Sequence, residues 1–255
     1  MRKRERFIIS SILLAFGLLA TQFVSSDIRP IAIVLFFIAS YLTSAWALNK
    51  TLNGLEWLTV VPFPAFYSLS VSLFYFLLPS NIISRVAILL LFGVGMYALY
   101  LASNIFSVGK VKTIQLLRAA HAVGSLFLFL LCLFFFNFVL SLGLSPLLNG
   151  LSIGAFVFLP ILCGIWSIEL LPSLSSRVIG TTVFLSLALG EIGVALSLLP
   201  IGLWASSLYL TAILYVGYGI IQNYFIGRLF AKTLQEYIWL VLFVSTSLLV
   251  LLEWK

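Results

Sequence analysis

Nine long apolar runs dominate the sequence, and each is about as long as a membrane is thick. They lie near Phe7–Ser25, Pro30–Leu48, Trp57–Leu78, Val86–Val108, Ala122–Leu144, Gly150–Leu171, Val178–Leu199, Ile201–Tyr224 and Tyr237–Leu252. At ~1.5 Å per residue, about 20 helical residues cross a hydrocarbon core of ~30 Å. Because lipid offers the backbone no hydrogen-bond partners, such runs must be helical. The sequence therefore predicts an all-α bundle with about nine spans, forming a single polytopic membrane domain over residues 1–255.

The composition fits a surface that faces lipid. Hydrophobic residues make up 63% of the chain and charged residues 8%, whereas soluble domains carry about 25% charged residues. The net charge of +7 is divided among the segments between the runs and does not form one basic domain, so it predicts no nucleic-acid partner. We expect the lipid bilayer as the surroundings, with another membrane protein or a second copy of the chain as further partners.

The positions of the basic residues predict the orientation. If the N-terminus lies in the cytoplasm, eleven of the fourteen basic residues fall in inner segments, and only Arg29, Arg85 and Lys255 fall in outer ones. Membrane proteins show this excess of Lys and Arg on the cytoplasmic side. We therefore expect the N-terminus inside, the C-terminus outside and a location in the cell membrane.

The first run has a second interpretation. Arg2–Arg6 followed by Phe7–Ala20 resembles a secretory signal peptide, with Val24-Ser25-Ser26 as a cleavage site. Cleavage would leave eight spans and would not change the orientation of the rest.

Two further patterns lie between the runs. The longest loop, Gly109–His121, is basic and predicts either a short amphipathic helix on the inner leaflet or a solvated turn. Leu77–Val86 reads LLPSNIISRV and Leu170–Val178 reads LLPSLSSRV. This match would relate the third and fourth runs to the sixth and seventh in opposite orientation, as in the inverted repeats of many secondary transporters. A chance match between leucine-rich segments is the alternative.

Glu191 is the polar residue that stands out inside a run. It lies slightly past the centre of the seventh run, where a charged side chain costs roughly 2.5–3.5 kcal/mol on insertion scales. We expect it to face the bundle interior, to be protonated or to find a partner on another helix, and the first pairing we expect is with Asn137 of the fifth run, which lies at a similar depth. This pair is either a proton or cation site or a protonated carboxyl that joins helices by a hydrogen bond. Three small residues would let another helix approach closely: Ser186, Gly190 and Gly193.

Five weaker candidates complete the set of polar sites. Glu169 lies near the inner end of the sixth run, where an interfacial ion pair with Arg118 or Arg177 is the simplest role. His121 lies at the inner mouth of the fifth run, as an interfacial residue or a proton relay. Ser68, Ser72 and Tyr75 share one face of the third run, behind two prolines. Such a stripe either lines a cavity or packs a kinked helix.

No residue pattern predicts catalysis, a cofactor or a metal. The sequence shows no Ser/His/Asp set, P-loop or dinucleotide fingerprint. It has one histidine, and both cysteines, Cys132 and Cys163, fall inside apolar runs, where packing is their usual role. We expect no cofactor and no metal, and enzymes are a disfavoured class.

One segment resembles a known group of proteins. Ser103–Gly124, SNIFSVGKVKTIQLLRAAHAVG, is similar to a segment of uncharacterised polytopic membrane proteins from small-genome bacteria. The resemblance implies a bacterial inner membrane. It implies no activity and no site residue.

Three function classes remain. An ion-coupled or small-solute transporter needs polar groups that converge on a cavity near the membrane midplane. A non-catalytic scaffold or accessory subunit needs an exposed helix face for a partner. A lipid-modifying enzyme needs a cleft with titratable side chains at headgroup level.

Overall fold

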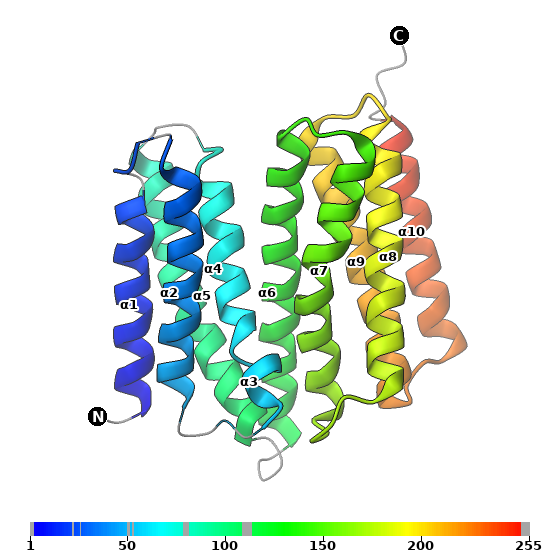
Figure 1. Ribbon diagram of the computed structural model, residues 1–255. Helices are drawn as coiled ribbons and strands as arrows, with labels where there is room; N and C mark the ends of the chain where they lie inside the picture. Colours follow the sequence, from blue (N-terminus) through cyan, green and yellow to red (C-terminus); the bar gives the residue numbers. More distant parts are fainter. Residues whose placement is uncertain are drawn as a thin grey trace. The chain divides into compact units, whose positions relative to one another are not determined.

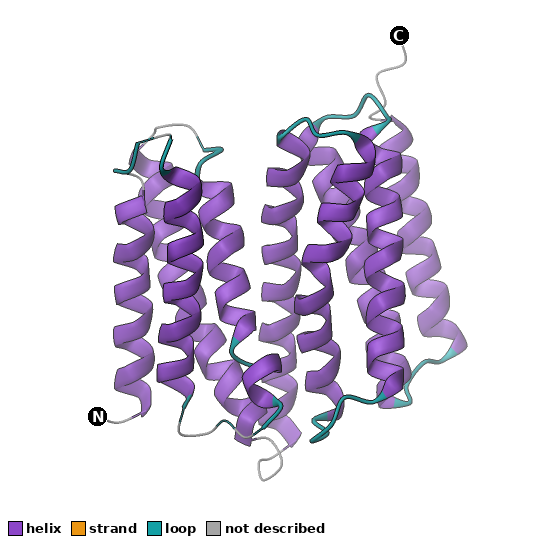
Figure 2. Cartoon of the chain, viewed as in Figure 1, coloured by secondary structure: helices purple, strands orange, loops and turns teal. Residues whose placement is uncertain are grey.

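Helices are the only regular secondary structure in the part of the protein that its computed structural model describes, residues 3–21, 23–25, 27–49, 52, 54–78, 82–108 and 114–250. The predicted all-α class is confirmed. The chain divides into two compact units, unit 1 (Met1–Leu131) and unit 2 (Cys132–Lys255) (Figure 1, Figure 2). The boundary lies inside helix α6 (Ile114–Ser141), where the sequence shows no change of composition.

Unit 1 is a helical bundle. It holds α1 (Lys3–Thr21), α2 (Arg29–Leu48), α3 (Glu56–Thr59), α4 (Pro62–Tyr75), α5 (Ile82–Val108) and the first part of α6. Four of these helices pack in a ring, in which α1 and α4 each contact both α2 and α5. Aromatic rings fill its core, and the largest fully buried ones are Phe7, Tyr67, Phe92 and Tyr100.

Unit 2 is built around one tight helix pair. It holds the rest of α6, then α7 (Pro146–Glu169), α8 (Ser176–Ser197), α9 (Leu203–Ile226) and α10 (Ala231–Val250). The closest packing joins α7 to α8, and α9 contacts both of them. Helix α10 packs on α9, and Leu248 is its one buried residue. Helix α10 begins at Ala231, six residues before the run predicted from Tyr237.

Eight helical segments within the described residues are long and apolar enough to cross a membrane: α2, the pair α3–α4, and α5 to α10. Helix α1 is a further long helix of 19 residues, and its first turn carries Lys3, Arg4, Glu5 and Arg6. It buries Phe7, Leu14 and Leu18, so it is a packed member of unit 1. The multi-pass membrane architecture follows from these helices. The count of nine spans and the orientation stay predictions.

The third predicted span is broken, as its two prolines indicated. Helix α3 ends at Thr59, and α4 begins with Pro62. Pro62 and Pro64 have no backbone N–H to donate to the preceding turn, so the helix cannot run on through Val60 and Val61.

The basic segment predicted before the fifth span is helical over its described part. Residues 109–113, with Lys110 and Lys112, lie outside the described residues. From Ile114 onward the chain forms one continuous helix into the fifth span. The described part of the predicted amphipathic helix is therefore the beginning of α6, because no proline or glycine interrupts residues 114–123.

The proposed inverted repeat stays a prediction. Residues 79–81 of its first copy lie outside the described residues. Its two helix pairs, α4–α5 and α7–α8, pack by different means. Gly95 of α5 makes room for the Tyr67 ring of α4, whereas α7 and α8 meet through glycines on both helices.

Candidate functional site

Glu191 lies on the exposed face of α8, and the prediction that it faces the bundle interior is wrong. Its side chain is exposed, and no described residue forms a hydrogen bond or an ion pair with it. Helix α8 turns another side toward the bundle, where Ser186, Gly190 and Gly193 are buried. These three small residues were predicted to admit another helix, and α7 packs against them.

Asn137 has a different partner from the one predicted. Its side chain is 4% exposed, and its amide Nδ2 donates to the Ser207 hydroxyl of α9 at 3.4 Å. That hydroxyl in turn donates to the Leu203 carbonyl at 2.7 Å. The structure does not bring Asn137 and Glu191 together, since one is buried between helices and the other is exposed.

The polar stripe of α4 is packed. Ser68 and Ser72 are fully buried, and Tyr75 is 2% exposed. The Ser72 hydroxyl donates to the Leu69 carbonyl at 2.8 Å, and Ser68 donates to the Pro64 carbonyl at 3.1 Å. Of the two predicted roles for this stripe, its burial favours helix packing.

Ser68 belongs to a chain of buried hydroxyls, the hydroxyl chain, formed by Ser40, Ser44, Ser68 and Tyr100. The Ser40 hydroxyl of α2 donates to Ser68 of α4 at 2.7 Å. One turn further along α2, Ser44 donates to the Ser40 carbonyl at 2.6 Å and lies 3.1 Å from the Tyr100 hydroxyl of α5. All four residues are fully buried. The hydroxyl chain thus joins three helices of unit 1.

Glu169 and His121 take part in local contacts. Glu169 ends α7, and its Oε2 accepts a hydrogen bond from the Ser175 hydroxyl at 3.1 Å. Arg177, one of its two predicted partners, lies over the Tyr224 ring, 5.9 Å from the ring centroid. In unit 1, the His121 ring packs on Phe106 with centroids 5.2 Å apart.

Among the described residues no group of three His, Cys, Asp or Glu side chains could hold a metal ion. Cys132 and Cys163 are free and buried. The predicted site candidates are divided between the two units: Ser68, Ser72, Tyr75 and His121 belong to unit 1, and Asn137, Glu169 and Glu191 belong to unit 2.

The interface of α7 and α8 is a glycine contact, which we call the glycine crossing: Gly150, Gly154, Ser186, Gly190 and Gly193. A Cβ atom on Gly150 would lie 2.6 Å from the Gly190 carbonyl oxygen, and one on Gly190 would lie 2.9 Å from the Gly150 oxygen. The two backbones touch here. The sequence signal was Gly150 and Gly154 in GxxxG spacing, a known pattern of membrane helix pairs.

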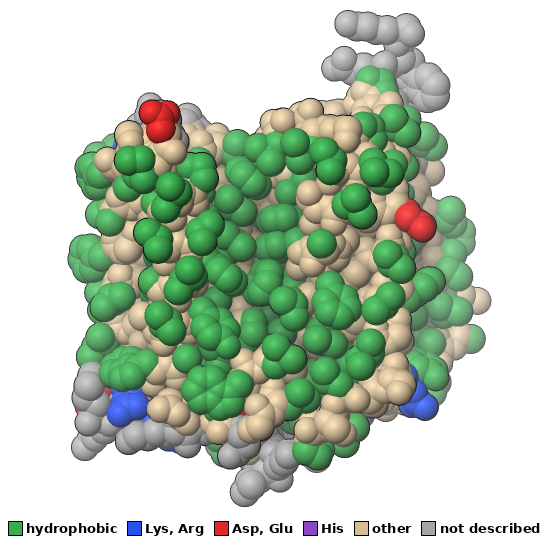
Figure 3. All heavy atoms as spheres, viewed as in Figure 1, with side chains coloured by type: hydrophobic (Ala, Val, Ile, Leu, Met, Phe, Trp, Pro, Cys, Tyr) green, Lys and Arg blue, Asp and Glu red, His purple; other side chains and the backbone are tan. Residues whose placement is uncertain are grey.

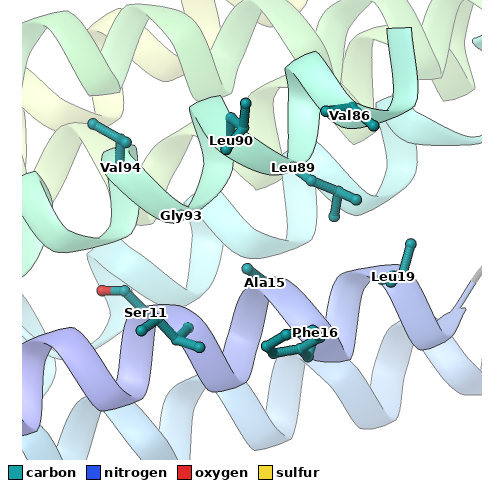
Figure 4. A pocket seen from close by; sticks show the side chains of 10 residues that line it. Ser11, Ala15, Phe16, Leu19, Val86, Leu89, Leu90, Gly93 and Val94 are labelled. Atoms are coloured by element: carbon teal, nitrogen blue, oxygen red, sulfur yellow. The ribbon is translucent and has the colours of Figure 1, made fainter. Parts of the chain in front are cut away.

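A groove of about 350 Å³ lies between α1 and α5 in unit 1. Ala15 and Leu19 point from α1 toward α5, and Leu89 points back (Figure 4). The groove's one polar side chain, Ser11, donates to the Phe7 carbonyl of its own helix at 2.7 Å. The lining therefore offers a ligand apolar contact but no free hydrogen bond.

Several residues of these contacts were missed from the sequence. Three serines lie within apolar runs, where hydroxyl residues are common and nothing indicates their contacts: Ser40, Ser44 and Ser207. The four-residue spacing of Ser40 and Ser44 puts both on one helix face, which was the available signal. Their partners on other helices follow only from the tertiary structure. Comparison of the chain with protein families, with curated proteins and with solved structures finds no match.

Proposed function

We propose that the protein is a non-catalytic membrane subunit that holds a partner membrane protein against the exposed face of α8. The observation that carries this proposal is Glu191. It is the sixteenth residue of the 22-residue helix α8, a candidate membrane span, and its side chain is exposed. An uncovered carboxyl at such a depth costs roughly 2.5–3.5 kcal/mol. A partner helix that supplies a hydrogen-bond donor removes most of this cost.

The residues around Glu191 form a continuous seam, the α8 stripe. Its members are all exposed and follow one another at steps of four and three residues: Gly180, Phe184, Leu187, Glu191, Ala195 and Leu198. This is the spacing of a seam along which two helices pack at a small angle. Gly180 and Ala195 are small enough for close approach, and a Cβ on Gly180 would meet nothing within 4 Å.

The charge pattern favours a different protein as the partner. Every described Lys or Arg within a helix lies among the first five residues of that helix, and the basic side chains in view in Figure 3 lie at helix ends. Arg177 of α8 is about 21 Å along the axis from Glu191 at ~1.5 Å per residue. A second copy in the same orientation would place Glu191 against Glu191, and like charges repel. We infer a partner span with Lys, Arg or another donor near its middle.

Transport is the less supported alternative. It relied on Glu191 facing the bundle interior and on the α4 stripe lining a cavity, whereas Glu191 is exposed and Ser68 and Ser72 are packed. We further propose a cell-membrane location with the N-terminus in the cytoplasm. The distribution of basic residues and the resemblance of Ser103–Gly124 to bacterial membrane proteins support it.

The test uses two synthetic transmembrane peptides and the full-length protein in vesicles. Both peptides are leucine-rich and identical except for one mid-span residue, Lys in the probe and Leu in its reference. Energy transfer between labels on protein and peptide measures association. We expect the Lys peptide to associate about tenfold more strongly, since interhelical polar contacts contribute ~1–2 kcal/mol in model peptides.

Two variants give this experiment its controls. Glu191→Leu should abolish the difference between the peptides. Glu236→Leu removes another exposed carboxyl, near the start of α10, and should leave the difference unchanged. Equal association of both peptides with the wild type would refute the proposal.

A further inference from the structure

The apolar groove between α1 and α5 begins at one end of these helices and stops near their middle. Leu19 and Val86 lie at one end of the groove, and Ser11 and Val94 lie at the other (Figure 4). Leu19 is two residues before the end of α1, and Val86 is the fifth residue of α5. Ser11 and Val94 lie close to the midpoints of the same two helices. The groove therefore covers eight residue steps on each helix, about 12 Å at ~1.5 Å per residue.

This length and depth match an acyl chain of one membrane leaflet. Helix α5 is a candidate span, and half of a ~30 Å hydrocarbon core is about 15 Å. A partner helix that spans the membrane continues past the midplane, whereas this lining ends near the middle of α1 and α5. A helix segment ~12 Å long and ~10 Å in diameter would also occupy roughly 900 Å³, and the groove holds about 350 Å³. The dimensions therefore favour a lipid chain over a helix.

The groove is open to its surroundings and apolar inside. Phe16 and Leu90 belong to its lining and are 67% and 64% exposed. Two small residues leave the space between the helices: a Cβ on Gly93 would meet only the Ala15 Cβ, at 3.7 Å. The Ser11 hydroxyl already donates to the carbonyl of its own helix. A hydrocarbon chain that enters from the bilayer thus leaves no polar group of the lining without its hydrogen bond.

A cation lies at the end of the groove where α5 begins. Arg85 directly precedes Val86, it is half-buried, and no described residue forms a hydrogen bond or an ion pair with it. Side chains of a helix lean toward its N-terminus, which for α5 is the membrane surface, so the guanidinium lies at the level of lipid head groups. Arg29 and Asp27 precede or begin α2 at the same end of unit 1. Together with Arg85 they leave this end with a net positive charge.

We infer that the groove binds an anionic phospholipid, with one acyl chain between α1 and α5 and the phosphate on Arg85. The guanidinium presents a planar fork of N–H donors that matches two phosphate oxygens. The groove has room for one chain, and the second chain stays in the bilayer. The apolar lining and the unpaired arginine thus recognise the two chemically different parts of the same lipid. The inference is independent of the α8 stripe, because its residues all belong to unit 1.

The experiment labels the full-length protein, in micelles of an uncharged detergent, with photoreactive lipids. Phosphatidylglycerol with a diazirine in one acyl chain is the probe, and diacylglycerol with the same chains and no phosphate is its reference. Mass spectrometry of peptides locates the crosslinks, and a titration gives the concentration at which labelling is half-saturated. We expect crosslinks on groove residues such as Ala15 and Leu89. Half-saturation should need about fivefold less phosphatidylglycerol than diacylglycerol, the effect of one basic residue on an anionic lipid.

Two pairs of variants test the two parts of the site. Arg85→Gln should remove the fivefold preference for phosphatidylglycerol, and Arg118→Gln, at an exposed arginine of α6, should keep it.

Gly93→Leu fills the groove and should lower its labelling by both lipids about fivefold or more. Gly180→Leu is the control, because a Cβ there meets nothing within 4 Å. Circular dichroism checks that each variant is folded, and Arg85→Gln tests the inference even if Gly93→Leu does not fold. Three results would overturn it: equal half-saturation by the two lipids, no crosslinks on the groove, or the same change in a variant and in its control.

Discussion

The glycine crossing of unit 2 and the hydroxyl chain of unit 1 hold membrane helices together in different ways. At the crossing the α7 and α8 backbones touch, and a Cβ on Gly150 would lie 2.6 Å from the Gly190 oxygen. In unit 1 side chains join the helices. Ser40 bonds to Ser68, and the Phe7 and Tyr100 rings stack at 5.8 Å between centroids.

The difference shows what replaces the hydrophobic effect within lipid. Lipid tails are as apolar as leucine, so helices associate through close packing and interhelical hydrogen bonds. At the glycine crossing the helices associate through close packing, which is possible because glycine has no Cβ atom. At the hydroxyl chain the helices associate through interhelical hydrogen bonds, which depend on the serine and tyrosine hydroxyl groups. The two regions should therefore respond to opposite kinds of substitution.

The largest effect is expected from adding atoms at the glycine crossing. In Gly150→Val the new side chain collides with the Gly190 carbonyl and with the Val194 side chain. Because backbone atoms cannot move aside as a flexible side chain can, we expect a loss of about 3 kcal/mol, the upper end for overpacking. Denaturant titration in mixed micelles, followed by circular dichroism, measures it.

Gly180→Val is the matched control on α8, since a Cβ there meets nothing within 4 Å. It should change the free energy of unfolding by less than ~0.5 kcal/mol. Similar losses in both variants would mean that valine propensity, and not the crossing, sets the cost.

The next effect tests the hydroxyl chain by removing atoms. We expect Ser40→Ala and Ser68→Ala each to lower the free energy of unfolding by about 1 kcal/mol, because each removes one side of a buried 2.7 Å hydrogen bond. The double variant should lose less than the sum of the two. A double-mutant cycle measures this coupling, and strictly additive losses would show that the bond contributes nothing to stability.

Tyr100→Phe should have a smaller effect. It removes the hydroxyl near Ser44 but keeps the ring that stacks on Phe7. Ser44 still donates to the Ser40 carbonyl, so no buried donor is left without a partner. We expect a loss of about 0.6 kcal/mol in the same titration. A loss as large as that of Ser40→Ala would mean that the whole hydroxyl chain depends on the tyrosine hydroxyl.

The smallest effect on stability is expected from Glu191→Leu. Its side chain is exposed and bonds to no described residue, so the free energy of unfolding of the isolated protein should change by less than ~0.5 kcal/mol. A loss above 1 kcal/mol would show that the carboxyl supports the fold of unit 2, which would remove the main support for the partner proposal.

Most of the helix positions could be predicted from the sequence, because apolar length alone decides where a chain crosses lipid. The break before Pro62 could also be predicted, since proline lacks the N–H that a continuous helix needs. The sequence did not predict that α6 begins at Ile114 or that α10 begins at Ala231. In both, polar residues extend a helix beyond its apolar run, and hydropathy does not report helices outside lipid.

Only part of the candidate site could be predicted from the sequence. Glu191 could be singled out because a carboxyl inside an apolar run is costly, but the side of α8 that carries it could not be assigned. Large apolar residues lie on the buried side of α8, as Leu185 and Leu189 do, and on its exposed side, as Phe184 and Leu187 do, so hydropathy does not distinguish the side that faces lipid from the side that faces protein. The groove between α1 and α5 could not be predicted either, because its lining residues are ordinary members of two apolar runs.

The sequence by itself determined that this chain is helical, spans a membrane several times and carries one costly carboxyl within a span. Those conclusions depend on length, hydropathy and charge, which are properties of single segments. Only the tertiary structure decided that Glu191 is exposed, that α7 and α8 meet at glycine backbones and that Ser40 bonds to Ser68. Contacts between helices depend on shape at the scale of single atoms. In a lipid environment both sides of a helix can be equally apolar, so hydropathy does not specify its neighbours.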